Sequence, residues 1–77
     1  MKEVLETIAK ALVDYPQDVS VKEVEGENET ILELKVNQND MGKVIGKQGR
    51  IAKAIRTVVK AAASCENKRV TVEIMDN

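Results

Sequence analysis

The sequence predicts a small α+β domain in which three helices accompany a mixed three-stranded sheet. Apolar residues recur at helical spacing in some segments and alternate in others, in the order helix, strand, strand, helix, helix, strand. A connection made of two helices is long enough to leave the second and third strands parallel, whereas the first two strands form an antiparallel hairpin. The length of 77 residues, with 43% hydrophobic and 32% charged residues, fits one domain spanning residues 1–77.

The first helix is predicted over residues 1–14. Apolar side chains recur every three or four positions from Val4 to Leu12, which places them on one side of a helix. The pair Tyr15-Pro16 then ends it, because proline cannot continue the backbone hydrogen bonding of a helix.

Two strands follow, predicted at residues 18–24 and 30–37. Both segments alternate apolar with polar residues, which is typical of strands with one buried face. The polar segment 25–29 contains Gly26 and separates them, so the two strands are predicted to form a hairpin.

The second half begins with a short helix ending at Ile45, for which Asn39-Asp40 is expected to supply the cap. A longer helix begins near Gly49, and alternation over residues 70–74 predicts the last strand. On the longer helix one side is apolar and the opposite side is basic; the two sets are Ile51, Ile55, Val58, Val59 and Ala62, and Arg50, Lys53, Arg56 and Lys60.

The formal net charge of −1 conceals a strong division along the chain. Residues 1–40 hold four lysines against ten acidic residues, a net charge of −6, while residues 41–69 hold eight basic residues against one acid, a net charge of +7. A basic surface on an otherwise acidic molecule attracts a polyanion to one side. The charge pattern alone leaves open a solvated helix face as the alternative.

Composition excludes several classes of function. The chain has no histidine and a single cysteine, Cys65, so neither a tetrahedral zinc site nor a histidine-activated nucleophile is available. We therefore expect no catalytic residues, metal or cofactor, and no enzyme activity. Tyr15 is the one aromatic residue, which leaves no platform for stacking bases as in RRM or OB folds. Charged residues interrupt the apolar start of the chain, so we expect no membrane segment and a cytoplasmic location.

The segment Gly46-Lys47-Gln48-Gly49 lies between the two predicted helices. Paired glycines permit a sharp reversal and the close approach of a phosphate, and the start of the following helix favours an anion. A Walker A loop does not fit, since Gly42 and Gly46 enclose three residues instead of four and Lys47 is followed by Gln48.

The run Val-Ile-Gly-Lys-Gln-Gly-Arg-Ile over residues 44–51, between a strand and a long helix, resembles the KH family in its helix-first, type II arrangement. Within that family it looks like the small bacterial members that consist of a single KH domain. The resemblance implies an RNA-binding protein, an RNA chaperone or post-transcriptional regulator, that grips about four nucleotides of single-stranded RNA. The implied RNA-binding residues are Lys43, Ile45, Gly46, Lys47, Gln48, Gly49, Arg50 and Lys53.

The resemblance also implies an apolar groove beside the loop, floored by Ile45 and by strand residues near Val36. Core packing is the alternative for Ile45, and Arg56 and Lys60 are expected on a solvated face. The resemblance to the KH family further implies a homodimer and pairing with a larger Jag-like RNA-binding protein. The competing hypothesis is an interaction or dimerisation module with weak or no RNA binding of its own.

Overall fold

A computed structural model describes residues 1–76. Three α-helices and three strands follow one another in the predicted order, joined by short 3₁₀ turns: α1 (Lys2–Leu12), η1 (Pro16–Asp18), β1 (Ser20–Glu25), β2 (Thr30–Val36), η2 (Gln38–Asp40), α2 (Met41–Ile45), η3 (Lys47–Gly49), α3 (Arg50–Cys65) and β3 (Val70–Asp76). The predicted α+β class and element order are confirmed.

The strands form one sheet in the order β1-β2-β3. β1 is antiparallel to β2, with Val21 opposite Leu34, and β3 is parallel to β2, with Val72 opposite Leu32. The crossover through α2 and α3 permits the parallel pairing, as the sequence predicts.

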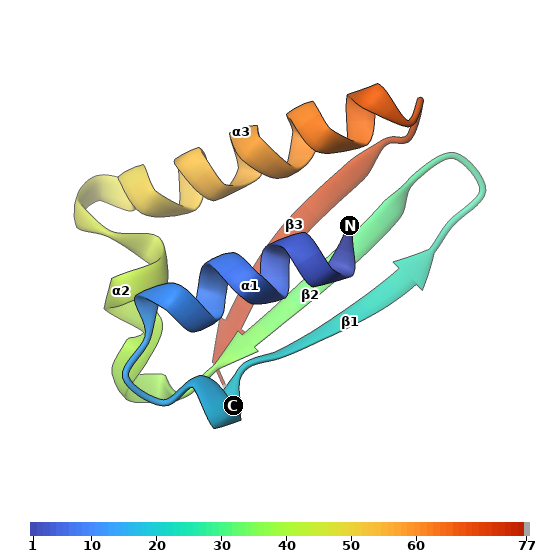
Figure 1. Cartoon of the computed structure of the whole chain (residues 1–77). Coiled ribbons are helices and arrows are strands. Elements are labelled where there is room, and N and C mark those ends of the chain that lie inside the picture. The colour runs from blue at the N-terminus through green and yellow to red at the C-terminus, as the bar shows by residue number, and fades with distance from the viewer. Residues whose placement is uncertain (77) are drawn as a thin grey trace.

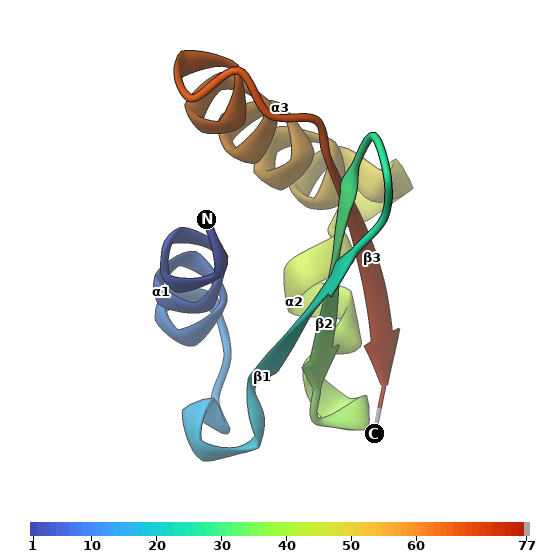
Figure 2. The same ribbon diagram turned by 90° about the vertical axis from the view of Figure 1, so that its right-hand side faces the viewer.

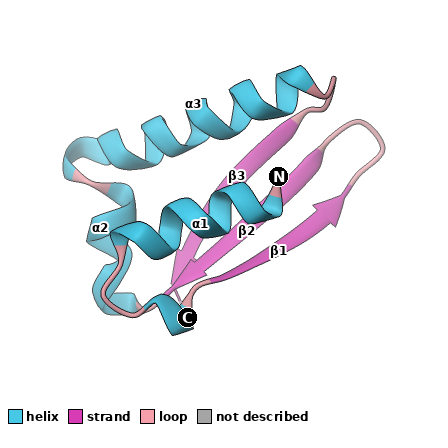
Figure 3. Ribbon diagram, in the orientation of Figure 1, coloured by secondary structure: helices cyan, strands magenta, loops and turns pink. Residues whose placement is uncertain are grey.

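The helices lie on one face of this sheet, so the domain has two layers (Figures 2 and 3). Leu32, Leu34 and Val36 of β2 are fully buried, while the residues between them point to the face that the helices leave open. The core joins the covered face to Leu5 and Ala9 of α1 and to one side of α3.

The buried side chains of helix α3 agree only in part with the predicted set, which they share at Ile55 and Val59. Its buried residues are Ala52, Ile55, Val59 and Ala63. Val58 is 49% exposed, although it belongs to the predicted apolar side. The sheet therefore covers only part of the apolar surface of α3.

Candidate nucleic-acid interface

Two glycines with positive φ angles shape the turn between α2 and α3 (Figure 1). α2 ends at Ile45 and is capped by Gly46, where φ is 76° and ψ is 176°; the Gly46 N–H donates to the carbonyl oxygen of Gly42 at 2.9 Å. Gly49, in the left-handed conformation at φ 74° and ψ 16°, precedes the first residue of α3. Gln48 between them also has a positive φ of 58°. The chain therefore reverses within four residues, as the paired glycines predict.

The two glycines meet different surroundings. A Cβ atom at Gly46 would lie 2.6 Å from Cγ1 of Ile51, closer than side-chain atoms approach one another. A Cβ atom at Gly49 would meet nothing within 4 Å. Gly46 is thus required by the packing of Ile51 beneath the loop, whereas the surface at Gly49 is open to an approaching molecule.

Cationic side chains surround the start of α3. Lys47 and Arg50 are exposed, and neither forms an ion pair with any residue from 1 to 76. Because the backbone N–H groups at the start of a helix carry partial positive charge, α3 adds to the same field. This combination of open backbone and uncompensated charge suits a phosphate group.

Lys43 is placed differently, although it lies only three residues before the loop. Its ammonium group bonds to the carboxylate of Asp14 and lies 3.5 Å from Oδ1 of Asp40. The hydrogen bond to Asp14 raises the pKa of Lys43 above its ordinary value, and the charge of Asp40 adds to that effect. Two carboxylates therefore compensate the charge of Lys43.

Asp40 is fully buried and ties α2 to the segment that follows α1. Its carboxylate accepts the backbone N–H groups of Asp14 at 3.2 Å and Tyr15 at 3.0 Å. Burial by itself would raise the pKa of the Asp40 carboxyl, but these hydrogen bonds and Lys43 outweigh it and hold the pKa below its ordinary value. Asp40 thus helps to fix the position from which α2 leads into the loop.

The expected cap at Asn39-Asp40 is wrong in its details. Asp40 stands at the start of α2, but its side chain makes no capping hydrogen bond there. The side chain of Asn37 instead accepts the N–H of Asn39 at 2.8 Å and caps the 3₁₀ turn η2. Asparagine is as good a cap as aspartate, so composition alone could not decide between them.

Comparison with known proteins adds an independent observation. The sequence profile of the KhpA/KhpB KH domain matches residues 2–74. The chain belongs to the KhpA/KhpB KH-domain family. The resemblance that residues 44–51 indicate is thereby confirmed.

Several relatives of this KH domain match over nearly their full length. The RNA-binding protein KhpA of Clostridium acetobutylicum is 73% identical over 75 residues, which cover 97% of this chain and 100% of the relative. Proteins of the same name from Caldanaerobacter subterraneus and Chlamydia trachomatis are 65% and 53% identical, over 97% and 99% of this chain and 100% and 97% of their own lengths.

Among solved structures, the KH domain is similar in fold to part of Era. In the crystal structure of Era in complex with MgGDPNP and nucleotides 1506–1542 of 16S ribosomal RNA, the matching part gives a TM-score of 0.61 at 23% identity. The match covers 97% of this chain but only 29% of that one. At this identity the likeness concerns the fold alone.

The remaining residues expected to contact RNA have mixed surroundings in this KH domain. Lys53 is exposed on α3, and Ile45 is partly buried against the core. Val36, like Leu34 on the same face of β2, has an exposed fraction of 0%, so the expectation that strand residues near Val36 floor a groove is wrong for that face. Its place on the covered face follows from strand alternation, but the depth of that burial depends on where the helices lie.

Arg56 makes a hydrogen bond to the sheet that the sequence did not indicate. Its Nε donates to the backbone carbonyl oxygen of Val72 in β3 at 3.3 Å. Arg56 is exposed, as expected for a solvated face, and this bond also ties it to the edge of the sheet. Helical spacing predicts which residues share a side of α3 with Arg56, but it does not predict which strand that side faces.

An apolar cleft of about 550 Å³ opens between α1 and α3. Leu12 and Val58 at this cleft are 37% and 49% exposed. Its lining residues are Ile8, Leu12, Arg50, Ile51, Ala54, Ile55 and Val58. Arg50 and Ile51 thus belong both to the start of α3 beside the loop and to this cleft.

Within residues 1–76, no group of three or more histidine, cysteine or acidic side chains is arranged to hold a metal ion. None of the helices in that range is long and apolar enough to cross a membrane. Cys65 is exposed at the end of α3.

Proposed function

We propose that this KH domain binds single-stranded RNA through the loop Gly46–Gly49, holding about four nucleotides by their backbone with Ile45 beside them. The exposed reversal at Lys47 and Gln48, with uncompensated charge at the start of α3, is the observation that carries this proposal. The names of the relatives support RNA as the polyanion and a binding role without catalysis. Lys53 extends the cationic surface along α3.

Replacing Lys47 and Gln48 together by aspartate tests the loop. Both glycines remain, and aspartate tolerates the positive φ of position 48, so the fold is retained. Two carboxylates would then repel a phosphate at the positive end of α3. We expect affinity for an unstructured RNA oligonucleotide to fall by roughly tenfold to several hundredfold, measured by fluorescence anisotropy at fixed salt.

The matched control makes the same two replacements elsewhere, as Lys2→Asp with Gln17→Asp. Both positions are exposed and lie outside the loop, so the net charge changes equally. This control should retain most of the parent's affinity. Equal losses in the two proteins would mean that net charge alone matters, and binding of a perfect duplex as tightly as a single strand would contradict the proposal.

We propose further that two copies of the chain associate through the apolar cleft between α1 and α3. The cleft exposes Leu12 and Val58, and a chain of this size gains stability by covering such a surface. Val58→Glu should shift sedimentation from dimer to monomer at micromolar concentration. If the parent is monomeric at every accessible concentration, the dimer proposal is wrong, while the RNA-binding proposal is unaffected.

The cleft is also the observation that favours a pure interaction module as the second candidate function. RNA titration of the parent separates the two candidates, since an interaction module would associate through the cleft and bind a single strand weakly or not at all. If the parent binds single-stranded RNA, we propose that the protein is a cytoplasmic RNA chaperone or post-transcriptional regulator. We extend this proposal to pairing with a larger Jag-like RNA-binding protein, which co-purification from cell extract tests.

A further inference from the structure

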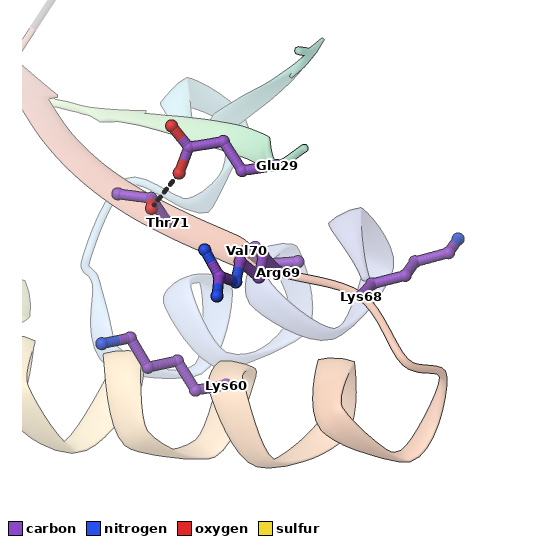
Figure 4. A pocket seen from close by; sticks show the side chains of 6 residues that line it. All are labelled: Glu29, Lys60, Lys68, Arg69, Val70 and Thr71. Atoms are coloured by element: carbon purple, nitrogen blue, oxygen red, sulfur yellow. Dashed lines mark hydrogen bonds between the residues drawn. The ribbon is translucent and has the colours of Figure 1, made fainter. Parts of the chain in front are cut away.

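A hollow of about 310 Å³ lies at the free edge of β3, near the end of α3 farthest from the loop. Figure 4 shows the side chains that line it. We call it the edge pocket; its lining residues are Glu29, Lys60, Lys68, Arg69, Val70 and Thr71. Lys60 reaches it from α3 and Arg69 from the residue directly before β3, while Lys68 points away (Figure 4). Two cationic groups from different elements therefore meet at this edge.

A backbone donor faces the same space. The carbonyl oxygen of Arg69 accepts the N–H of Thr30 at 2.8 Å, so it points toward β2. The carbonyl and the N–H of one trans peptide point in opposite directions, so the N–H of Val70 points away from β2. β3 is the last strand of the sheet, and the Val70 N–H therefore faces the edge that the pocket occupies.

The charge in the edge pocket is largely uncompensated. Over residues 1–76, neither Lys60 nor Arg69 forms an ion pair. Glu29 is the acid among the lining residues, and its Oε2 accepts the hydroxyl of Thr71 at 3.1 Å. The pocket thus offers two cations and a backbone donor against one carboxylate that is held to the wall by Thr71.

A row of basic residues connects the edge pocket with the loop. Lys53, Arg56 and Lys60 follow at steps of three and four residues and so share one side of α3. The bond from Arg56 to the carbonyl oxygen of Val72 turns this side toward β3. Lys60 lies eleven residues beyond Gly49, a distance of about 16 Å along a helix. One polyanion can therefore reach both ends of the row.

We propose that the edge pocket binds a backbone phosphate of the same RNA strand that the loop holds, with Lys60, Arg69 and the Val70 N–H as donors. This inference rests on the proposed function and adds a second anchor to it. A strand fixed at both ends of α3 lies along the basic row with a defined path. Contacts of this kind carry no base preference, so they raise the affinity for all sequences alike.

The experiment compares single-stranded RNA affinity across a salt series for the parent and three variants. Lys60→Gln with Arg69→Gln removes the two cations, and Lys22→Gln with Lys35→Gln removes two exposed charges from β1 and β2 as the matched control. Losing one phosphate contact should lower the slope of log affinity against log salt by about 0.7, and the affinity by about tenfold at low salt. The control should change neither by a comparable amount.

The third variant, Glu29→Gln, should act in the opposite direction. An amide oxygen still accepts the Thr71 hydroxyl, while the negative charge beside the phosphate is lost. We expect the affinity to rise by about two- to fivefold, the size of one interaction between solvent-exposed unit charges. The variant also tests the edge pocket without removing either cation.

The outcomes are distinct. If Lys60→Gln with Arg69→Gln binds as tightly as its control, or if Glu29→Gln binds less tightly than the parent, the edge pocket is not a phosphate site, and the loop proposal is unaffected. If the parent binds no single-stranded RNA even at low salt, both proposals are wrong.

Discussion

Replacing glycine by alanine should lower the free energy of unfolding by different amounts at Gly46 and Gly49, the two ends of the loop. At Gly46 the backbone angles of 76° and 176° belong to a region that glycine alone adopts readily, and placing another residue there costs about 1–3 kcal/mol. The new Cβ would also lie 2.6 Å from Ile51, and forcing a methyl group into a packed site costs about another 1–3 kcal/mol. We expect Gly46→Ala to lower the free energy of unfolding by about 2–6 kcal/mol.

Gly49→Ala is the matched control because it carries only one of these costs. Its backbone is left-handed, which costs a residue with a side chain about 1–2 kcal/mol, and no atom lies within 4 Å of the added Cβ. The difference between the two variants therefore measures the contact with Ile51 and the more restrictive backbone of Gly46.

Urea denaturation followed by circular dichroism measures both values. A chain of this length has a free energy of unfolding of about 4–12 kcal/mol, and 1 kcal/mol moves its melting temperature by about 4–8 °C. Gly46→Ala should therefore lose a large part of its stability, with an unchanged dependence on denaturant.

A double-mutant cycle identifies the cause. If Ile51 is the obstacle, Ile51→Ala relieves most of the clash, because it removes the Cγ1 and Cδ1 atoms that would lie 2.6 and 2.9 Å from the new methyl group and leaves only Cβ at 2.9 Å. The combined loss with Gly46→Ala should then be smaller than the sum of the single losses by about 1–3 kcal/mol. Equal losses for the two glycine variants, or strict additivity in the cycle, would refute this account of the loop.

Three further predictions concern other residues. Because the folded-state pKa of Asp40 is lowered, its contribution to stability is present above the ordinary aspartate pKa and is lost as the pH falls through the folded value; thermal denaturation between about pH 2 and 6 should show this loss, and Asp40→Asn should flatten it. Lys43→Gln should reduce RNA affinity less than Lys47→Gln, since Asp14 and Asp40 already compensate Lys43; the reverse order in anisotropy titrations would contradict the site described above. Cys65 should react with a thiol reagent in the native protein at nearly its denatured rate, whereas protection until unfolding would disprove its exposure.

The elements of this fold could be predicted because their signals are local. Alternation over residues 30–37 and the glycines at 46 and 49 act on their immediate neighbours, and the structure places β2 and the loop where those patterns indicate. The first helix ends two residues earlier than predicted, at Leu12, because Val13 is already extended before Pro16 is reached.

The rest depended on partners that sequence spacing does not reveal. The hydrogen-bond donors to Asp40 precede it by 25 and 26 positions, so no nearby pattern could distinguish it from an ordinary helix cap. Val58 belongs to an apolar stripe, but the stripe is wider than the surface that the sheet covers. In the sequence Arg56 is one basic residue among several on α3, and only the structure shows that it bonds to β3.

The buried carboxylate of Asp40 limits how far this domain can be reduced. A peptide that begins at β2 would still contain the loop, both of its flanking helices and the edge strand. It would lack the Asp14 and Tyr15 amides that now satisfy this carboxylate, and it would expose the core surface that Leu5 and Ala9 cover. In such a fragment the Asp40 carboxylate would either stay buried without these donors, which is costly, or reach water only by opening the packing at the start of α2. We therefore do not expect the loop to keep its structure in such a fragment.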